Sequence, residues 1–289
     1  MKAKVGIIGT GNIGCDLLVK VMRSDMLECS IFAGHNPDSE GIKFAKKLGI
    51  PTTFDSIKYI ENHPDCCDIV FDATSAKVHI YNAPILERLS KFAIDLTPAR
   101  VGYFCVPIIN LKQALEQKNV NLITCGGQAT IPVACALAKI HPEIEYLEIA
   151  ATIASRSAGI GTRNNIDEFT QATKDALKDF TGIKKTKAII VLNPAEPPIN
   201  MRTTIYALVE KPNMDAIRKS VFEMAEKVKN YIPGYKTIVE PTLENGRITT
   251  TIEVTGRGDY LPSYAGNLDV ITCAAVKIAE AYAQKHGGV

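Results

Sequence analysis

A glycine-spaced turn near the amino terminus constrains the fold most. Residues 5–8 form a short apolar strand pattern, Gly9, Gly11 and Gly14 follow with the spacing GxGxxG, and a helical pattern begins at Ile13. In this strand–turn–helix setting the glycines permit a tight turn, close approach of a pyrophosphate and close packing of helix on strand. We therefore expect a dinucleotide site formed by Gly9, Thr10, Gly11, Asn12, Ile13 and Gly14.

The pattern of strands and helices changes along the chain. Strands and helices alternate up to about residue 124, which predicts a Rossmann-type parallel sheet. Beyond about residue 138, long strands with few crossovers predict an α+β domain with a largely antiparallel sheet. A chain of 289 residues, 46% of them hydrophobic, can bury two cores. We predict an α/β protein with a dinucleotide-binding domain at residues 1–127, to which a helix at 268–289 returns, and a catalytic and dimerisation domain at 128–267.

Polar residues follow two strands of the first domain. Asn36 comes after the strand at residues 28–33, where an acidic residue would bind the adenosine ribose. Asparagine can bind ribose hydroxyls without repelling a 2′-phosphate, and arginine is absent nearby, so we expect NAD while neither form of the cofactor is excluded. Thr74 is a candidate hydroxyl contact, although capping of the next helix explains the Thr74–Ser75 pair equally well.

Cys125 is the candidate nucleophile. It follows a buried strand ending near Ile123 and precedes a helix that we expect to start at Pro132 and to run to about Ala138. The helix N-terminus would favour the reactive thiolate, and Gly126 and Gly127 would leave room for a substrate carbonyl beside the sulfur. The alternative is a small buried residue that ends a strand.

Two loops carry more polar groups than a connection needs. The segment from Ser155 to Asn165 offers N–H groups, hydroxyls and two guanidinium groups to an anion or a carboxamide. The second loop, residues 193–198, is a proline-rich turn with one acid, Glu196, which a purely structural turn would leave solvated.

Composition excludes several kinds of partner. A net charge of +2, with both signs interspersed, argues against nucleic acid and membrane surfaces. The eight cysteines lack the density of a disulfide scaffold, and the first strand starts too early for a signal peptide, so we expect a cytoplasmic protein. Vicinal Cys66 and Cys67 lie near His63 and Asp65 without a second ligand pair, so we expect no metal.

Several motifs are together specific to one family. They are Gly9–Gly14, Phe71–Ser75, Asp95–Pro98, Cys125–Pro132, Ser157–Gly159, Gly161–Arg163, Ile166–Thr170, Asn193–Pro198 and Tyr260–Asp269. Nearly end to end, the chain resembles the acylating acetaldehyde dehydrogenases that partner 4-hydroxy-2-oxovalerate aldolases, enzymes of aromatic hydrocarbon catabolism. The resemblance implies NAD-dependent oxidation of acetaldehyde, or of a short homologue, to the acyl-CoA, with coenzyme A as co-substrate.

The resemblance also implies roles for individual residues. Cys125 would carry the acyl thioester. Nicotinamide contacts would come from Gly11–Gly14 and from Ser157, Ala158, Gly159, Ile160, Gly161, Thr162, Arg163, Asn164, Asn165 and Asn267. Two positions depart from the family, which usually has an acid at Asn36 and an aspartate, thought to be a base near the cysteine, at Thr203. Threonine cannot act as a base at neutral pH, so either a water, Glu196 or another group would take that role, or catalysis would be slower.

Two other functions compete with this interpretation. One is reduction of acyl phosphates, as in aspartate-semialdehyde dehydrogenase, but neither His79 nor His141 pairs convincingly with the cysteine in the sequence. The other is a dinucleotide-sensing subunit that uses Cys125 as a redox switch. The strands at residues 144–154 and 249–254 offer apolar faces that suit a homodimer, and a complex with the aldolase is expected from the resemblance.

Overall fold

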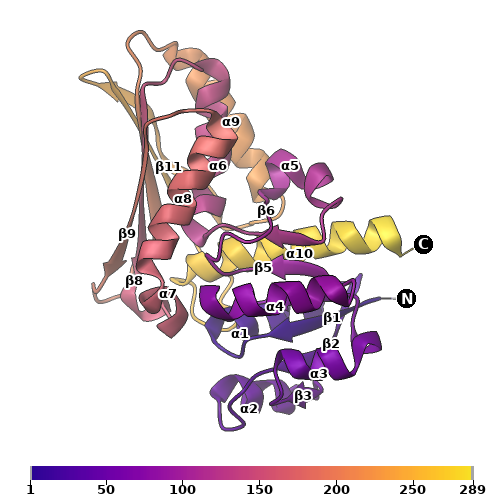
Figure 1. The fold of residues 1–289 in the computed structure, drawn as a ribbon. Helices are drawn as coiled ribbons and strands as arrows, with labels where there is room; N and C mark the ends of the chain where they lie inside the picture. Colours follow the sequence, from indigo (N-terminus) through magenta and orange to yellow (C-terminus); the bar gives the residue numbers. More distant parts are fainter. Residues whose placement is uncertain (1, 288–289) are drawn as a thin grey trace. The chain divides into compact units, whose positions relative to one another are not determined.

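The computed structural model describes residues 2–287, apart from the side chain of Ile160. The chain forms two compact units, which are described separately below. Unit 1 comprises Met1–Leu122, Asp259–Leu261 and Ile271–Val289, and unit 2 comprises Ile123–Gly258 and Pro262–Val270. Figure 1 shows the ribbon of both units, coloured along the sequence from indigo at the N-terminus to yellow at the C-terminus. In the described part of the chain, no helix has the length and apolar character needed to cross a membrane.

Unit 1 is built on a seven-stranded parallel sheet in the order β3-β2-β1-β4-β5-β7-β6. The order reverses beside β1, as in doubly wound folds. The central strand β4 is buried along its whole length, as expected for a parallel sheet covered on both faces. This confirms the expected Rossmann-type sheet. The strands are β1 (Ala3–Ile8), β2 (Leu27–Ala33), β3 (Thr52–Thr53), β4 (Ile69–Asp72), β5 (Phe92–Asp95), β6 (Tyr103–Phe104) and β7 (Asn119–Asn121).

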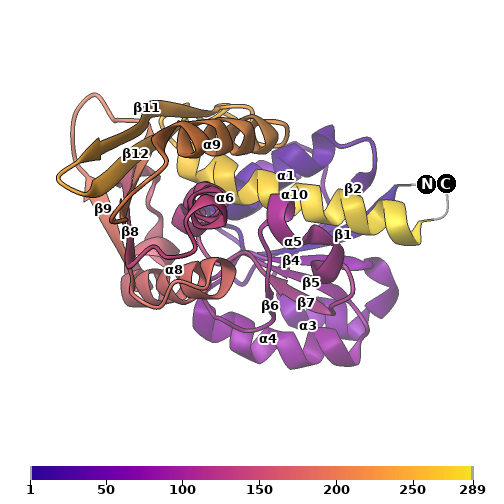
Figure 2. The same ribbon diagram turned by 90° about the horizontal axis from the view of Figure 1, so that it is seen from above.

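Helices cover both faces of this sheet. Figure 2 shows α3 and α4 on one face and α1 with α10 on the other. From Ile271 onward α10 belongs to unit 1, where the Thr272 hydroxyl donates to Asp16 at 2.7 Å. The helices are α1 (Asn12–Arg23), α2 (Glu40–Lys47), α3 (Ile57–Asn62), η1 (Pro64–Cys66), α4 (Ala76–Arg88), α5 (Pro107–Ala114) and α10 (Gly266–His286).

Unit 2 contains a five-stranded sheet in the order β11-β12-β10-β8-β9. Three neighbouring pairs are antiparallel, which confirms the expected largely antiparallel sheet, while β8 and β9 run parallel, so the sheet is mixed. The reason is the crossover through α8, which returns the chain to the end of the sheet where β8 began. The strands are β8 (Tyr146–Ala154), β9 (Thr186–Asn193), β10 (Met201–Leu208), β11 (Tyr235–Glu244) and β12 (Arg247–Val254).

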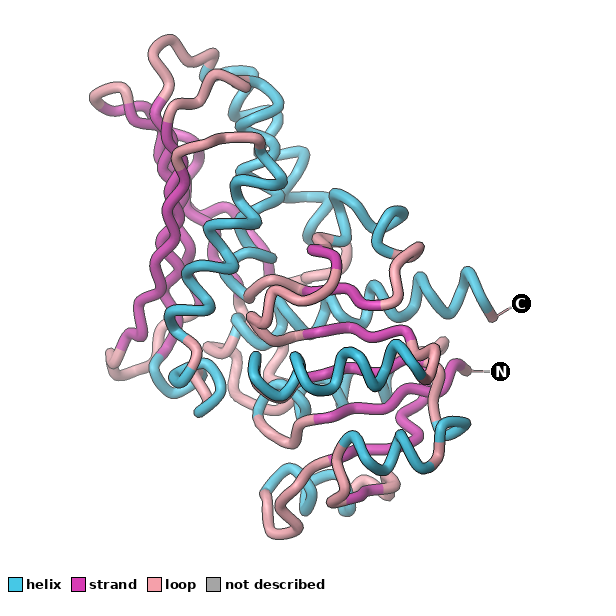
Figure 3. Tube along the Cα trace, viewed as in Figure 1, coloured by secondary structure: helices cyan, strands magenta, loops and turns pink. Residues whose placement is uncertain are grey.

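The helices of unit 2 lie on one face of its sheet. Figures 2 and 3 show α6, α8 and α9 side by side on that face. Alternate residues of β8, among them Leu147, Ile149 and Ala151, are buried beneath them, while the other face of the sheet is left half-exposed. The helices are α6 (Cys125–Ile140), η2 (Ser155–Ser157), α7 (Ile160–Asn164), α8 (Ile166–Thr181) and α9 (Met214–Lys229).

Candidate functional site

The glycine turn of unit 1 has three different steric environments. Gly9 adopts φ +113°, and a Cβ there would lie 2.4 Å from the Ala73 carbonyl oxygen. A Cβ on Gly14 would lie 1.9 Å from the Gly9 carbonyl oxygen. Around Gly11, by contrast, a Cβ would meet no described atom within 4 Å. Gly9 and Gly14 are therefore required by the turn itself, whereas Gly11 borders open space.

The first turn of α1 faces the same open space. Gly11 is the N-cap residue of α1, and no described side chain caps the helix there. The first N–H groups of a helix have no partner within it and favour an anion. The Thr10 hydroxyl lies 3.1 Å from the Ser39 hydroxyl, which links the turn to the start of α2. Residues Thr10–Ile13 thus offer backbone N–H groups and space rather than charged side chains.

Asn36 lies in the exposed turn after β2. Its Oδ1 accepts a hydrogen bond from the Asp38 N–H at 2.9 Å. The side-chain carbonyl therefore stabilises the turn, and the carboxamide N–H groups are what it can offer to a ribose.

Thr74 lies in the turn after β4 and is held by Asp72. The Oδ1 atom of buried Asp72 accepts hydrogen bonds from both the N–H and the hydroxyl of Thr74. Ser75, not Thr74, caps α4 by accepting from the Val78 N–H at 3.4 Å. The Thr74 hydroxyl is thus already committed as a donor, and its remaining capacity is to accept.

Cys125 is the first residue of α6, not a residue ahead of it. Thr124 is the N-cap and accepts a hydrogen bond from the Gly127 N–H at 2.9 Å, so the helix starts at Cys125 and Pro132 lies within it. The prediction of a helix start at Pro132 was wrong, because a capping threonine ahead of two small residues outweighed the proline signal. The residue before the cap, Ile123, has φ +64°, which is strained for a β-branched side chain.

The two glycines after Cys125 make room for protein, not for substrate. A Cβ on Gly126 would lie 2.9 Å from the Phe169 ring and 3.2 Å from the Ala151 Cβ. A Cβ on Gly127 would lie 3.0 Å from a methyl group of Ile123. Both glycines are buried, and they let the first turn of α6 pack on β8 and α8. We expected the two glycines to leave space for a substrate carbonyl. That expectation was wrong, because protein atoms fill the space beside both of them.

Burial dominates the pKa of the Cys125 thiol. Although the residue is only half-buried, desolvation raises the pKa of the thiol to about 12, against the lowering effect of hydrogen bonds from the Gly126 and Cys125 N–H groups. The helix N-terminus acts in the expected direction, but burial outweighs it.

The segment from Ser155 to Asn165 is a short 3₁₀ turn and a short helix, and its side chains bind its own carbonyl groups. Ser157 is buried and donates to the Ala154 carbonyl at 2.8 Å. Arg163 donates to the carbonyls of Ala158 and Ser155 at 3.1 and 2.7 Å. Asn165 is buried and donates to the Gly161 carbonyl at 2.5 Å. Gly161, Arg163 and Asn164 are exposed, Gly159 and Thr162 are half-buried, and exposed Arg156 pairs with Glu196 outside the segment.

Asn267 has an unused acceptor. The residue is 5% exposed, at the start of α10, and its Oδ1 has no hydrogen-bond partner among the described residues. An unsatisfied buried carbonyl costs roughly 1–3 kcal/mol, so the position calls for an N–H donor from outside the protein. A carboxamide group such as that of nicotinamide would supply one.

Thr203 lies on the face of the unit 2 sheet that the helices cover. It pairs with Ala151 across β10 and β8, and Gly126 packs against Ala151. The Thr203 side chain is buried, and its Oγ1 has no partner among the described residues. Glu196, which we considered as a replacement base, forms an exposed ion pair with Arg156 at 2.8 Å. The sequence alone gave no sign of that pair.

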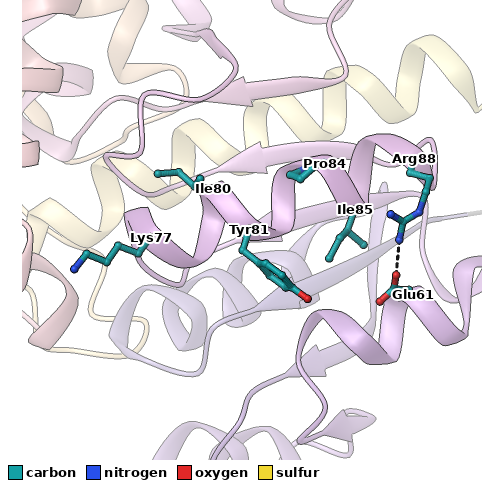
Figure 4. A pocket seen from close by; sticks show the side chains of 7 residues that line it. All are labelled: Glu61, Lys77, Ile80, Tyr81, Pro84, Ile85 and Arg88. Atoms are coloured by element: carbon teal, nitrogen blue, oxygen red, sulfur yellow. Dashed lines mark hydrogen bonds and ion pairs between the residues drawn. The ribbon is translucent and has the colours of Figure 1, made fainter.

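Two further features lie outside the candidate site. Cys67 is buried and Cys66 half-buried, with their sulfur atoms 3.7 Å apart; the Cys67 S–H and nearby Lys91 and His63 lower the pKa of Cys66. Figure 4 shows a groove along α3 and α4 in which Arg88 pairs with Glu61, lined by Glu61, Lys77, Ile80, Tyr81, Pro84, Ile85 and Arg88. Its lining contains none of the expected site residues.

Comparison with solved structures defines the class of fold. Aspartate-semialdehyde dehydrogenase II from Vibrio cholerae, solved with ASA, aligns with a TM-score of 0.66 and 13% identity over 99% of this chain and 100% of that one. The aspartate-semialdehyde dehydrogenase of Candida albicans, solved with NADP, gives 0.63 and 12% over 96% and 99%. At such identities the likeness shows the fold alone: the chain has the two-unit fold of the semialdehyde dehydrogenases.

Sequence comparison places the chain more narrowly. Residues 125–262 match the family model described as prokaryotic acetaldehyde dehydrogenase, dimerisation. The acetaldehyde dehydrogenase of Pectobacterium atrosepticum is 54% identical over 281 residues, 96% of this chain and 95% of that protein. That of Geobacillus stearothermophilus is 53% identical over 98% and 97%. The chain belongs to the acetaldehyde dehydrogenase family, which confirms the family predicted from the motifs.

Proposed function

We propose that this protein catalyses the NAD-dependent, CoA-acylating oxidation of acetaldehyde or a short aliphatic aldehyde to the acyl-CoA, reversibly. The observation that carries the proposal is the position of Cys125 as the first residue of α6, where the Gly126 N–H reaches its sulfur. The same N–H groups, at the start of a helix, can stabilise an oxyanion formed on a carbon attached to that sulfur. Membership of the acetaldehyde dehydrogenase family supports the aldehyde substrate.

The chemistry follows from the thiol. Cys125 loses its proton and adds to the aldehyde carbon, which gives a thiohemiacetal bound to the enzyme. NAD, when bound, supplies the hydride acceptor that converts this adduct to a thioester. The thiol of coenzyme A then attacks the thioester carbon, takes the acyl group and returns the sulfur of Cys125. The balance is aldehyde, CoA and NAD⁺ giving acyl-CoA, NADH and a proton.

The residues of each unit suit one part of NAD. In unit 1, Gly11 borders open space at an uncapped helix start, which suits a pyrophosphate. In unit 2, the orphaned Oδ1 of Asn267 suits the nicotinamide carboxamide. Because Ser157, Arg163 and Asn165 bind their own segment, we assign contacts from residues 157–165 to the backbone and to Thr162 and Asn164.

We expect NAD rather than NADP by a modest margin. Asn36 lies in an exposed turn and offers amide N–H groups to ribose hydroxyls. No arginine adjoins it in the sequence to bind a 2′-phosphate. Steady-state kinetics with each cofactor measure the preference, and a higher kcat/KM with NADP would reverse it.

The direct test is product formation. Purified protein is mixed with acetaldehyde, CoA and NAD, and acyl-CoA and NADH are measured together. We expect equal amounts of both, dependent on CoA. Phosphate-dependent formation of an acyl phosphate would point to the semialdehyde dehydrogenase reaction, and NAD binding without turnover would point to a sensing subunit.

The proposal includes a homodimer formed through unit 2. The family model names this region a dimerisation domain, and the sheet face away from the helices carries half-exposed Ala150 and Thr204 and exposed Val191 and Leu208. Light scattering should give twice the mass of 31.4 kDa. An Ala150→Arg change should give the monomer, because it places a charge in the middle strands of that face.

Partnership with an aldolase is the last part of the proposal. Acetaldehyde is volatile and reactive, so direct transfer from the 4-hydroxy-2-oxovalerate aldolase that forms it would limit its loss. A separate aldehyde-trapping enzyme added to the mixed pair is the test. We expect it to intercept a minor part of the aldehyde, and interception of most of it contradicts channelling.

A reducing, cytoplasmic location is consistent with all eight described cysteines being without a disulfide.

A further inference from the structure

A fully buried histidine joins two strands of the unit 1 sheet. His79 projects from α4, is 0% exposed, and places Nδ1 2.9 Å from Asp72 Oδ2, while its Nε2 lies 3.0 Å from Asn119 Nδ2 and 3.4 Å from Asp95 Oδ2. Asp72 ends β4 and Asp95 ends β5, and the two are partners across the sheet. One imidazole therefore bridges the carboxyl ends of two neighbouring parallel strands.

Each aspartate uses its other oxygen to hold the turn that follows its strand. Asp72 Oδ1 accepts from the Thr74 N–H at 3.1 Å, and Asp95 Oδ1 accepts from the Thr97 N–H at 2.7 Å. Each Oδ2 also receives an amide donor, from Asn82 at 2.8 Å and from Asn121 at 2.6 Å. The same arrangement is thus repeated on both strands, with His79 at its centre.

The turn held by Asp72 adjoins the glycine turn. The Ala73 N–H donates to the Ile8 carbonyl at 2.7 Å, and a Cβ on Gly9 would lie 2.4 Å from the Ala73 carbonyl oxygen and 3.1 Å from the Thr74 nitrogen. Gly9 and the Thr74 turn are therefore in van der Waals contact. A shift of Asp72 would be transmitted to the backbone that precedes Gly11.

The charges account for the bridge. Burial by itself lowers the pKa of His79, but the hydrogen bond to Asp72 and the charges of Asp95 and Asp72 outweigh it, so the pKa is raised. Burial raises the pKa of Asp95 to about 7, with His79 opposing and Asp72 adding to the rise. A protonated ring donates from both nitrogens. The Asn119 carboxamide places its nitrogen 3.0 Å from Nε2 of His79, and its Oδ1 has no partner among the described residues. A flip of this carboxamide exchanges the two atoms, so that Oδ1 accepts a hydrogen bond from a protonated Nε2.

We propose that His79 is a positioning residue of the dinucleotide site: by bridging Asp72 and Asp95 it fixes the turns at Thr74 and Thr97 and, through Thr74, the glycine turn at Gly9. The inference rests on the proposed function, since it assigns the glycine turn to NAD. The ligand whose binding depends on His79 is therefore the dinucleotide and not the aldehyde or CoA. Without the imidazole, two buried carboxylates face each other and the turns separate.

The experiment measures NADH binding by fluorescence titration of the full-length His79→Gln protein. We expect the Kd to rise by about tenfold or more, because the turns lose their fixed geometry. The KM for NAD should rise in parallel, while kcat at saturating NAD stays near the wild-type value. A His79→Gln protein that folds and binds NADH with wild-type affinity overturns the inference.

Two further variants make the result decisive. His141→Gln removes a histidine of unit 2 that bonds Glu143 and the Asn213 N–H, so it should alter stability without altering the Kd for NADH.

Asp95→Asn is isosteric and removes one buried charge, so it tests the role of the bridge if His79→Gln does not fold. We expect its Kd to rise by about threefold as one anchor of the imidazole weakens, and an unchanged Kd overturns the inference. Failure of the wild-type protein to bind NADH would contradict the proposed function instead.

Discussion

The hydroxyl of Thr124 lies 2.7 Å from the hydroxyl of Thr173, deep between α6 and α8. Thr173 donates its own proton to the Phe169 carbonyl at 2.7 Å, so Thr124 is the donor in the pair. Thr124 also accepts from the Gly127 N–H. One hydroxyl thus caps the helix that begins at Cys125 and ties that helix start to α8.

Replacing Thr124 with valine should loosen this helix start. The change leaves the Gly127 N–H without its acceptor, and we expect a loss of about 1–2 kcal/mol in the free energy of unfolding. Denaturant unfolding measures it. Thr170→Val is the matched control, because the Thr170 hydroxyl bonds only within α8, to the Asp167 carbonyl at 2.9 Å. Equal losses in the two variants would show that the cap has no special role.

Replacing Cys125 with serine should abolish acyl-CoA formation and preserve the fold and NADH binding. Serine is nearly isosteric, but its hydroxyl has a far higher pKa and is a much poorer nucleophile, so we expect a loss of at least about 10³-fold in kcat/KM. Circular dichroism and NADH titration monitor the fold and the cofactor. Turnover within tenfold of the wild type would contradict the assignment.

The raised pKa of Cys125 predicts the pH dependence of its reaction. With a pKa of about 12, the thiolate fraction in the absence of ligands rises roughly tenfold for each pH unit through neutral and mildly alkaline pH. The rate of alkylation by iodoacetamide should follow that slope without a plateau below about pH 9. The measurement uses a Cys66→Ser background, because Cys66 is the more acidic thiol. A plateau near pH 7 would show that Cys125 is a thiolate at rest.

An aspartate at position 203 tests whether a base can act beside Cys125. Thr203 pairs with Ala151, against which Gly126 packs, so a carboxylate there would be near the first turn of α6. We expect Thr203→Asp to raise the rate of acyl-CoA formation at pH 7 by about tenfold, because the carboxylate would take the thiol proton as the sulfur attacks the aldehyde. Thr204→Asp is the control, because Thr204 faces the other side of the sheet and contacts Thr251. An equal effect of both changes would rule out a local base.

Gly11 and Gly14 should respond differently to alanine. Gly11 has φ −83° and open space around it, so Gly11→Ala should leave the melting temperature unchanged and weaken NADH binding by about tenfold or more, since the methyl group occupies the place of a phosphate. Gly14→Ala places a methyl group against the Gly9 carbonyl oxygen and should lower the melting temperature. Unchanged NADH affinity in Gly11→Ala would move the pyrophosphate elsewhere.

Sequence patterns sufficed for unit 1 because its signals are local. The apolar runs of β1, β4 and β5, and the glycine spacing from Gly9 to Gly14, fix strand direction and turn shape within a few residues. The bridge through His79 could not be foreseen, because it joins α4 to strands that end seven residues before it and sixteen after it. The one hint in the sequence was His79 itself, a histidine in an expected helix that directly follows a strand ending in Asp72.

Unit 2 and the cysteine were harder because tertiary packing decided them. Pro132 suggested a helix start, but the Thr124 cap and the fit of Gly126 against Phe169 begin the helix at Cys125. The mixed sheet depends on a crossover whose path no local pattern encodes. Ser157 and Arg163 have binding-type side chains, yet the turn they stabilise uses up their hydrogen bonds.

The pair Cys66–Cys67 changes what oxidation of this protein would mean. Peroxide reacts with thiolates, and in the resting protein the lowered pKa belongs to half-buried Cys66, while that of Cys125 is raised. We therefore expect Cys66, which lies outside the candidate site, to be oxidised before Cys125. A preparation that falls short in a thiol count would then be expected to keep the sulfur of Cys125.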